Sequence, residues 1–70
     1  MLNIPEWQKV LIAIRKGKTS FKTFKGAYTK QLLYELEEQK FIKINKDNIS
    51  LLDKGFKIVE GVVYGFFESL

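Results

Sequence analysis

The sequence predicts an α+β fold in which helices surround one short antiparallel pair of strands. Three observations lead to this prediction. Residues 27–39 carry leucines at helical spacing, residues 41–52 contain two β-branched and aromatic runs around a polar turn, and residues 54–69 return to an apolar helical pattern. Helices and strands repeat with different periods, so each change of pattern marks a change of element. We expect one domain over residues 1–70.

The first helix is expected over residues 5–16. Pro5 suits the first turn, because its missing N–H would have no partner there. Gly17 follows two basic residues and is typical of a helix end. One apolar stripe at spacings i, i+3, i+4 and i+7 should face the core, formed by Trp7, Val10, Leu11 and Ile14.

Residues 18–26, KTSFKTFKG, fit either a helix or a strand, because propensity does not decide so short a run. We expect a short helix over residues 20–25, with Phe21 and Phe24 turned into the core. The outer side of this helix would then carry three lysines, namely Lys18, Lys22 and Lys25.

The third helix is expected over residues 27–39, with Thr29, Leu33 and Leu36 on its inner side. Strands are expected at about 41–45 and 49–52, because the residues after Phe41 alternate and a polar turn follows. Asp53 is a candidate N-cap for a last helix over residues 54–69.

The net charge of +4 is strongly polarised along the chain. Residues 1–30 hold seven Lys and Arg against one acid, a net +6, whereas residues 31–70 hold five lysines against seven acids, a net −2. A positive region of this kind attracts polyanions. We therefore expect a polyanionic partner.

The composition argues against catalysis. The chain has no histidine and no cysteine, and its carboxylates lack metal-ligand spacing. We expect no catalytic residue, no metal, no cofactor and no small-molecule ligand. The apolar stretch at 61–67 is far shorter than the roughly 20 residues of a membrane span. We expect a cytoplasmic protein, and leave open whether it is nucleoid-associated or encoded by a virus.

Two segments resemble a known family. Residues 32–42, LLYELEEQKFI, are similar to the end of the recognition helix in MarR-type and related small archaeal and viral winged helix-turn-helix regulators. Residues 52–55, LDKG, resemble the step that ends their wing. The resemblance implies three N-terminal helices with a short second one, a two-stranded wing and a C-terminal helix. Lys40 is a departure, because most members have glycine there, at the residue that leaves the helix.

The resemblance also implies a DNA-binding surface, with the outer side of the third helix in a major groove. Base contacts would come from Tyr28, Lys30, Gln31 and Tyr34, and the Gln31 amide suits adenine. Phosphate contacts would come from Lys18, Lys22, Lys25, Lys43 and Lys46. We expect a transcriptional regulator that binds double-stranded DNA sequence-specifically. Two alternatives stay open: a winged-helix module that binds a protein, such as transcription machinery or a host factor, and a sequence-neutral DNA-binding protein.

The last helix is apolar on more than one side, which a chain this small cannot cover alone. Its apolar residues include a series at alternating spacings of three and four, typical of a packed helix pair. We expect a homodimer whose interface comprises Phe56, Val59, Val62, Val63, Phe66, Phe67 and Leu70. The alternative is a helix packed wholly on its own protomer.

Overall fold

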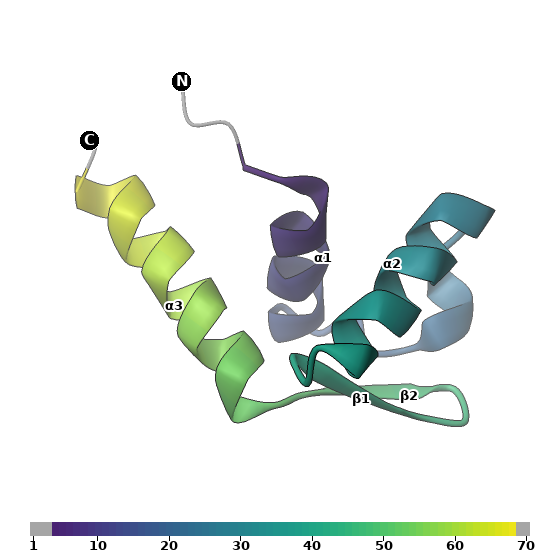
Figure 1. Cartoon of the computed structure of the whole chain (residues 1–70). Helices are drawn as coiled ribbons and strands as arrows, with labels where there is room; N and C mark the ends of the chain where they lie inside the picture. Colours follow the sequence, from purple (N-terminus) through teal and green to yellow (C-terminus); the bar gives the residue numbers. More distant parts are fainter. Residues whose placement is uncertain (1–3, 69–70) are drawn as a thin grey trace.

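The computed structural model describes residues 4–68, with side chains as far as residue 61. Its elements in chain order are α1 (Glu6–Arg15), the 3₁₀ turn η1 (Phe21–Thr23), α2 (Ala27–Glu38), β1 (Ile42–Asn45), β2 (Asn48–Leu51) and α3 (Asp53–Glu68). α1 lies between α2 and α3, and the β1–β2 hairpin runs across the lower side of the view in Figure 1. The α+β class is confirmed, with three α-helices and one antiparallel sheet in the described part.

α1 matches its predicted bounds to within one residue at each end. Pro5 is its N-cap, and the Pro5 carbonyl accepts hydrogen bonds from the N–H groups of Gln8 and Lys9. At the other end Gly17 has φ 117°. The Lys18 N–H donates to the carbonyl of Ala13, five residues earlier, at 3.0 Å. This closure uses the positive φ that glycine adopts freely, so Gly17 ends the helix as predicted.

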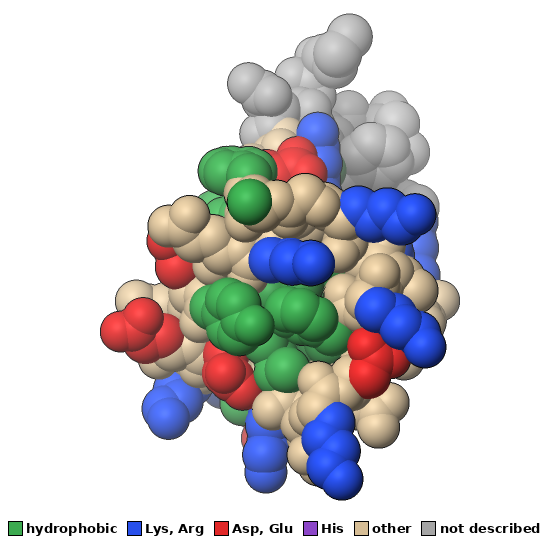
Figure 2. Space-filling model, turned by 90° about the vertical axis from the view of Figure 1, so that its right-hand side faces the viewer, with side chains coloured by type: hydrophobic (Ala, Val, Ile, Leu, Met, Phe, Trp, Pro, Cys, Tyr) green, Lys and Arg blue, Asp and Glu red, His purple; other side chains and the backbone are tan. Residues whose placement is uncertain are grey.

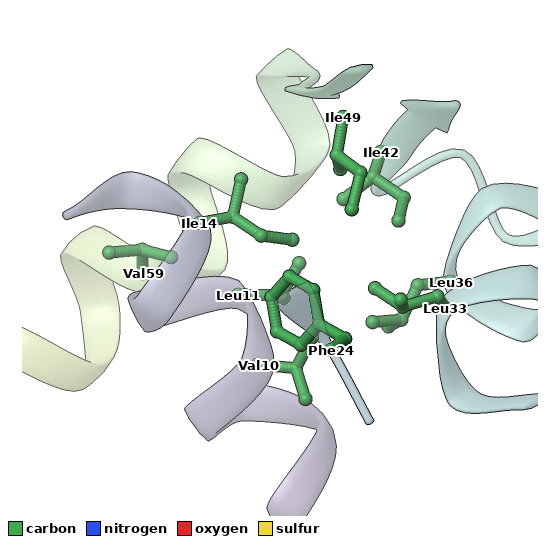
Figure 3. Close-up of a cluster of buried hydrophobic side chains, with 9 residues drawn as sticks. All are labelled: Val10, Leu11, Ile14, Phe24, Leu33, Leu36, Ile42, Ile49 and Val59. Carbon is green, nitrogen blue, oxygen red and sulfur yellow. The ribbon is translucent and has the colours of Figure 1, made fainter. Parts of the chain in front are cut away.

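Among the residues whose side chains are described, 4–61, the core is a cluster of nine buried apolar side chains, drawn in Figure 3. Every α-helix and both strands contribute to it. The members are Val10, Leu11, Ile14, Phe24, Leu33, Leu36, Ile42, Ile49 and Val59. Burying one such side chain contributes about 1.5–3 kcal/mol. The inner stripes predicted for α1 and α2 therefore face the core, with Trp7 and Thr29 partly buried at its margin.

The segment between α1 and α2 differs from the prediction. In place of a helix over residues 20–25 it forms only the turn η1. The Ile49 N–H donates to the Thr19 carbonyl at 2.7 Å, and the Phe21 N–H donates to the Asp47 carbonyl at the same distance. Backbone groups bonded to the hairpin are not free to build an α-helical ladder. Phe21, predicted in the core, is only partly buried.

The C-terminal end of α2 turns through Lys40, whose φ is 68°. A residue with a Cβ is strained there by roughly 1–2 kcal/mol. The Phe41 N–H donates to the Leu36 carbonyl at 3.0 Å and closes the turn. Lys54 adds a contact from α3, because its Nζ donates to the Gln39 carbonyl at 2.9 Å. Lys40 therefore adopts the positive φ that glycine usually supplies at the end of a helix.

The hairpin strands begin and end within one residue of the predicted bounds. Asn45 pairs with Asn48, so Lys46 and Asp47 form the loop. Lys46 has φ 57°, the positive φ that two-residue hairpin loops require at their first position.

α3 begins at Asp53, which is therefore its first residue and not the predicted N-cap. Its carboxylate still lies in the first turn, near the positive end of the helix. Gly55 is buried, and a Cβ on it would lie 2.4 Å from the Phe41 carbonyl oxygen and 2.8 Å from Leu51 Cδ1. The glycine at the end of the 52–55 motif is required by this close contact.

Replacing Gly55 by alanine is expected to lower the free energy of unfolding by about 1–3 kcal/mol, the usual cost of overpacking. Urea denaturation measures the change. Gly61 is the matched control on the same helix, because a Cβ there meets no atom within 4 Å. Gly61→Ala should raise stability by up to about 1 kcal/mol, since alanine favours the helix. Equal effects of the two substitutions would contradict the close contact.

Candidate nucleic-acid interface

The outer side of α2 presents all four residues predicted to contact bases. Tyr28 and Tyr34 are 66% and 58% exposed, and Lys30 and Gln31 are exposed as well. Figure 2 shows this side of the molecule. Hydrophobic side chains gather in its middle, with several Lys and Arg and a few acidic side chains around them.

Two contacts hold side chains on this surface in place. The Tyr34 ring packs against the Phe21 ring of η1, with centroids 5.5 Å apart and the planes tilted by 49°. The Gln31 Nε2 group donates to Glu35 Oε1 at 3.4 Å, a long hydrogen bond one turn along the helix. Sequence reasoning missed the role of Phe21, because its aromatic character alone suggested the core.

Lys18, Lys22 and Lys25 are exposed on the segment that leads into α2. Lys18 Nζ lies 4.6 Å from the centroid of the Phe24 ring, a distance at which a cation is attracted by the ring face. Lys25 stands two residues before Ala27, the first residue of α2.

The hairpin loop is anchored to the same segment through Asp47. Its carboxylate accepts hydrogen bonds from the Ser20 hydroxyl and, at 2.9 Å, from the Lys22 N–H. These two bonds, together with the nearby Lys22 charge, lower the pKa of the Asp47 carboxyl below its ordinary value of 3.8. Lys46, which precedes Asp47 in the hairpin loop, is exposed.

β1 is tied to α2 through Glu37. The Ile44 N–H donates to Glu37 Oε2 at 2.7 Å, so the position of the hairpin follows that of the helix. Lys43 is exposed on β1 beside this bond. Neither Glu37 nor Asp47 was assigned a role from the sequence, because each bonds to a segment that only the fold brings near.

The C-terminal half of α2 has the opposite charge. Glu35 and Glu38 are exposed there, and with Trp7, Leu32 and Phe41 they line an open depression of about 380 Å³. Carboxylates repel phosphate groups, so a polyanion is best accommodated at the N-terminal half of α2 and the lysines before it.

The residues predicted at a dimer interface divide into three groups. Phe56 is 37% exposed, and Arg15 Cζ lies 5.4 Å from its ring centroid. Val59 is 5% exposed and belongs to the core of its own protomer, which accounts for its apolar character without a second chain. Val62, Val63, Phe66 and Phe67 lie on the α3 backbone beyond the described side chains, and Leu70 lies outside the described residues.

Comparison with known proteins finds no matching family model, no similar curated protein and no similar solved structure. Within the described part of the chain no three acidic side chains come together as metal ligands would. Among residues 4–68 no helix has the length and apolar character to cross a membrane.

The Asp47 anchor predicts a pH-dependent loss of stability. Because the folded-state pKa lies below the unfolded value, the stabilisation is fully present above the unfolded pKa of about 4 and is lost as the pH falls through the folded value. Asp47→Ala should therefore destabilise the protein at pH 7, and the difference from the wild type should shrink in acid. Urea denaturation over this pH range measures both.

Ser20→Ala provides the control for this anchor, because it removes the hydroxyl donor and leaves the carboxylate. Its effect at pH 7 should largely disappear in the Asp47→Ala background, as expected for two groups in one hydrogen bond. A difference between wild type and Asp47→Ala that stays constant from neutral to acid pH would contradict the assignment.

Proposed function

We propose that this protein is a winged helix-turn-helix transcriptional regulator that binds double-stranded DNA sequence-specifically, with α2 in the major groove. One observation carries the proposal. The outer side of α2 presents Tyr28, Lys30, Gln31 and Tyr34 together, beside exposed lysines of the preceding segment and the hairpin. A major groove is about 12 Å wide and admits an α-helix.

The order of the elements supports this proposal. In this proposal α1, η1 and α2 would correspond to the three N-terminal helices, the hairpin to the wing, and α3 to the C-terminal helix. In helix-turn-helix proteins the element before the recognition helix crosses the DNA backbone. Lys22 on η1 and Lys25 after it would then meet phosphates.

The side chains fall into two chemical classes. The Gln31 amide can pair with the N6 and N7 groups of adenine, and Lys30 can reach guanine or a phosphate. The remaining lysines, Lys18, Lys22, Lys25, Lys43 and Lys46, bind phosphates and set the position of the protein without reading sequence. The acidic C-terminal half of α2 points to base contacts from the N-terminal half, as in other recognition helices.

The proposal includes a homodimer formed through α3. α3 continues to Glu68, and Val59 is the last of its residues in the core cluster among the side chains described, which extend to residue 61. The sequence of this part, VVYGFF at 62–67, is apolar throughout. A two-fold dimer would place two α2 helices about one DNA turn apart, near 34 Å, on a palindromic site.

Binding to duplex DNA should depend steeply on salt. We expect about four phosphate contacts per protomer, which gives twice that number for the proposed dimer and lowers its affinity by about ten-thousandfold between roughly 50 and 200 mM salt. Gln31→Ala should cost about 1–3 kcal/mol on the preferred site and little on random DNA. Lys25→Ala should weaken both to the same extent and reduce the salt slope. Fluorescence anisotropy with a selected and a random duplex measures all three.

Two outcomes would change this proposal. If no duplex is bound at low salt, the DNA function fails and a protein partner for the same surface becomes the better hypothesis. If Gln31→Ala and Lys25→Ala lose selected and random binding in equal proportion, the protein binds DNA without reading sequence.

The dimer is tested by analytical ultracentrifugation at tens of micromolar protein. Wild type should sediment as a dimer, and its melting temperature should rise with concentration. Val63→Glu should give a monomer or insoluble protein, because a buried unpaired charge costs several kcal/mol. Lys57→Glu, at an exposed site of α3, is the control and should remain dimeric. A monomeric wild type with a concentration-independent melting temperature would exclude this assembly.

A further inference from the structure

Two of the largest exposed hydrophobic side chains lie on the proposed reading surface. Within the described part of the chain the exposed large hydrophobics are Tyr28, Tyr34 and Phe56. Phe56 is partly covered by the guanidinium of Arg15, 5.4 Å from its ring. The two tyrosines are more exposed than Phe56, at 66% and 58%, on the side of α2 that also carries exposed Lys30. Figure 2 shows hydrophobic side chains in the middle of this side of the molecule, with Lys, Arg and a few acidic side chains around them. A polyanion with apolar groups of its own would match both features.

The tyrosines flank the proposed adenine-reading residue at regular spacing. Tyr28, Gln31 and Tyr34 follow one another at intervals of three residues along α2. Each interval is a rise of about 4.5 Å with a rotation of about 300°, so the three side chains form a diagonal row on the outer side. DNA base pairs rise by about 3.4 Å. The row can therefore face neighbouring base pairs in one groove.

Contacts within the protein orient this row. The Phe21 ring packs against the Tyr34 ring, with 5.5 Å between the ring centroids. Glu35 holds the Gln31 amide at 3.4 Å. Tyr34 is therefore the more firmly positioned of the two tyrosines, because no ring contact supports Tyr28 among the described residues.

The major groove offers one apolar group on its base edges, the 5-methyl group of thymine. Resting on the DNA-binding function proposed above, we propose that Tyr28 and Tyr34 are specificity-determining residues that pack against thymine methyl groups. The adenine read by Gln31 then lies between them. The preferred site is a short run of A·T pairs whose thymines are recognised by their methyl groups.

The test replaces thymine by uracil, which removes the methyl group and leaves base pairing intact. A duplex selected from a random pool is synthesised with single thymine-to-uracil changes, and binding is measured by anisotropy at constant salt. Losing one methyl contact should weaken binding about three- to fivefold at the recognised thymines. Substitution at the other thymines should have no effect.

Variants connect each methyl group to its tyrosine. Tyr34→Ala should abolish the thymine-over-uracil preference at one position and Tyr28→Ala at another, whereas Tyr34→Phe keeps the ring and should keep the preference. Lys25→Ala is the matched control, since it lowers affinity for the thymine and uracil duplexes alike. Both tyrosines are exposed, so circular dichroism should show that these variants fold.

The outcomes separate this inference from the function on which it rests. Failure to bind any duplex at low salt overturns the DNA-binding function itself. Sequence-dependent binding that is lost with Gln31→Ala but is unchanged by uracil overturns the inference and leaves the function standing. Selection of no sequence, or tighter binding of the single strand than of the duplex, also overturns it, because the tyrosines would then not read a major groove.

Discussion

The joint burial of Leu11, Leu33 and Ile42 is the interaction on which the other features depend. These are the largest fully buried side chains, and they come from α1, α2 and β1. Because Leu33 is fully buried against these side chains, α2 must turn the side that carries Leu33 toward the core. The side of α2 that carries Gln31 must then face outward. The buried apolar residues of α2 thus determine which of its polar side chains are exposed on the outer side.

Most elements could be predicted from the sequence because their residues record a local pattern. The stripe around Val10 and the leucines of α2 repeat with the helical period, and the strands alternate around a polar loop, so their bounds agree with the structure within one or two residues. The resemblance placed Lys40 where most family members have a glycine that leaves the helix, and left open whether the helix ends differently at lysine; Lys40 has the positive φ of such a glycine. The exposure of Tyr28 and Tyr34 followed from the same helical period.

The remaining features depend on contacts between distant parts of the chain, which no local pattern records. The propensity of residues 20–25 does not decide between helix and strand, and the contact of Phe21 with the hairpin loop leaves only a 3₁₀ turn there. Asp47 reads as an ordinary turn residue, although its carboxylate joins the loop to Ser20. Val59 fits a helix-pair seam, and the same spacing also suits a helix packed on its own core.

The way the hairpin is held has a consequence for aggregation. Ile44 and Ile49 face each other across the two strands with N–H groups that point outward. Glu37 accepts the first, and the Thr19 carbonyl accepts the second. Open strand edges of this kind otherwise template pairing with another chain. Since both edges are occupied at this pair, the addition of a strand from another chain is disfavoured there.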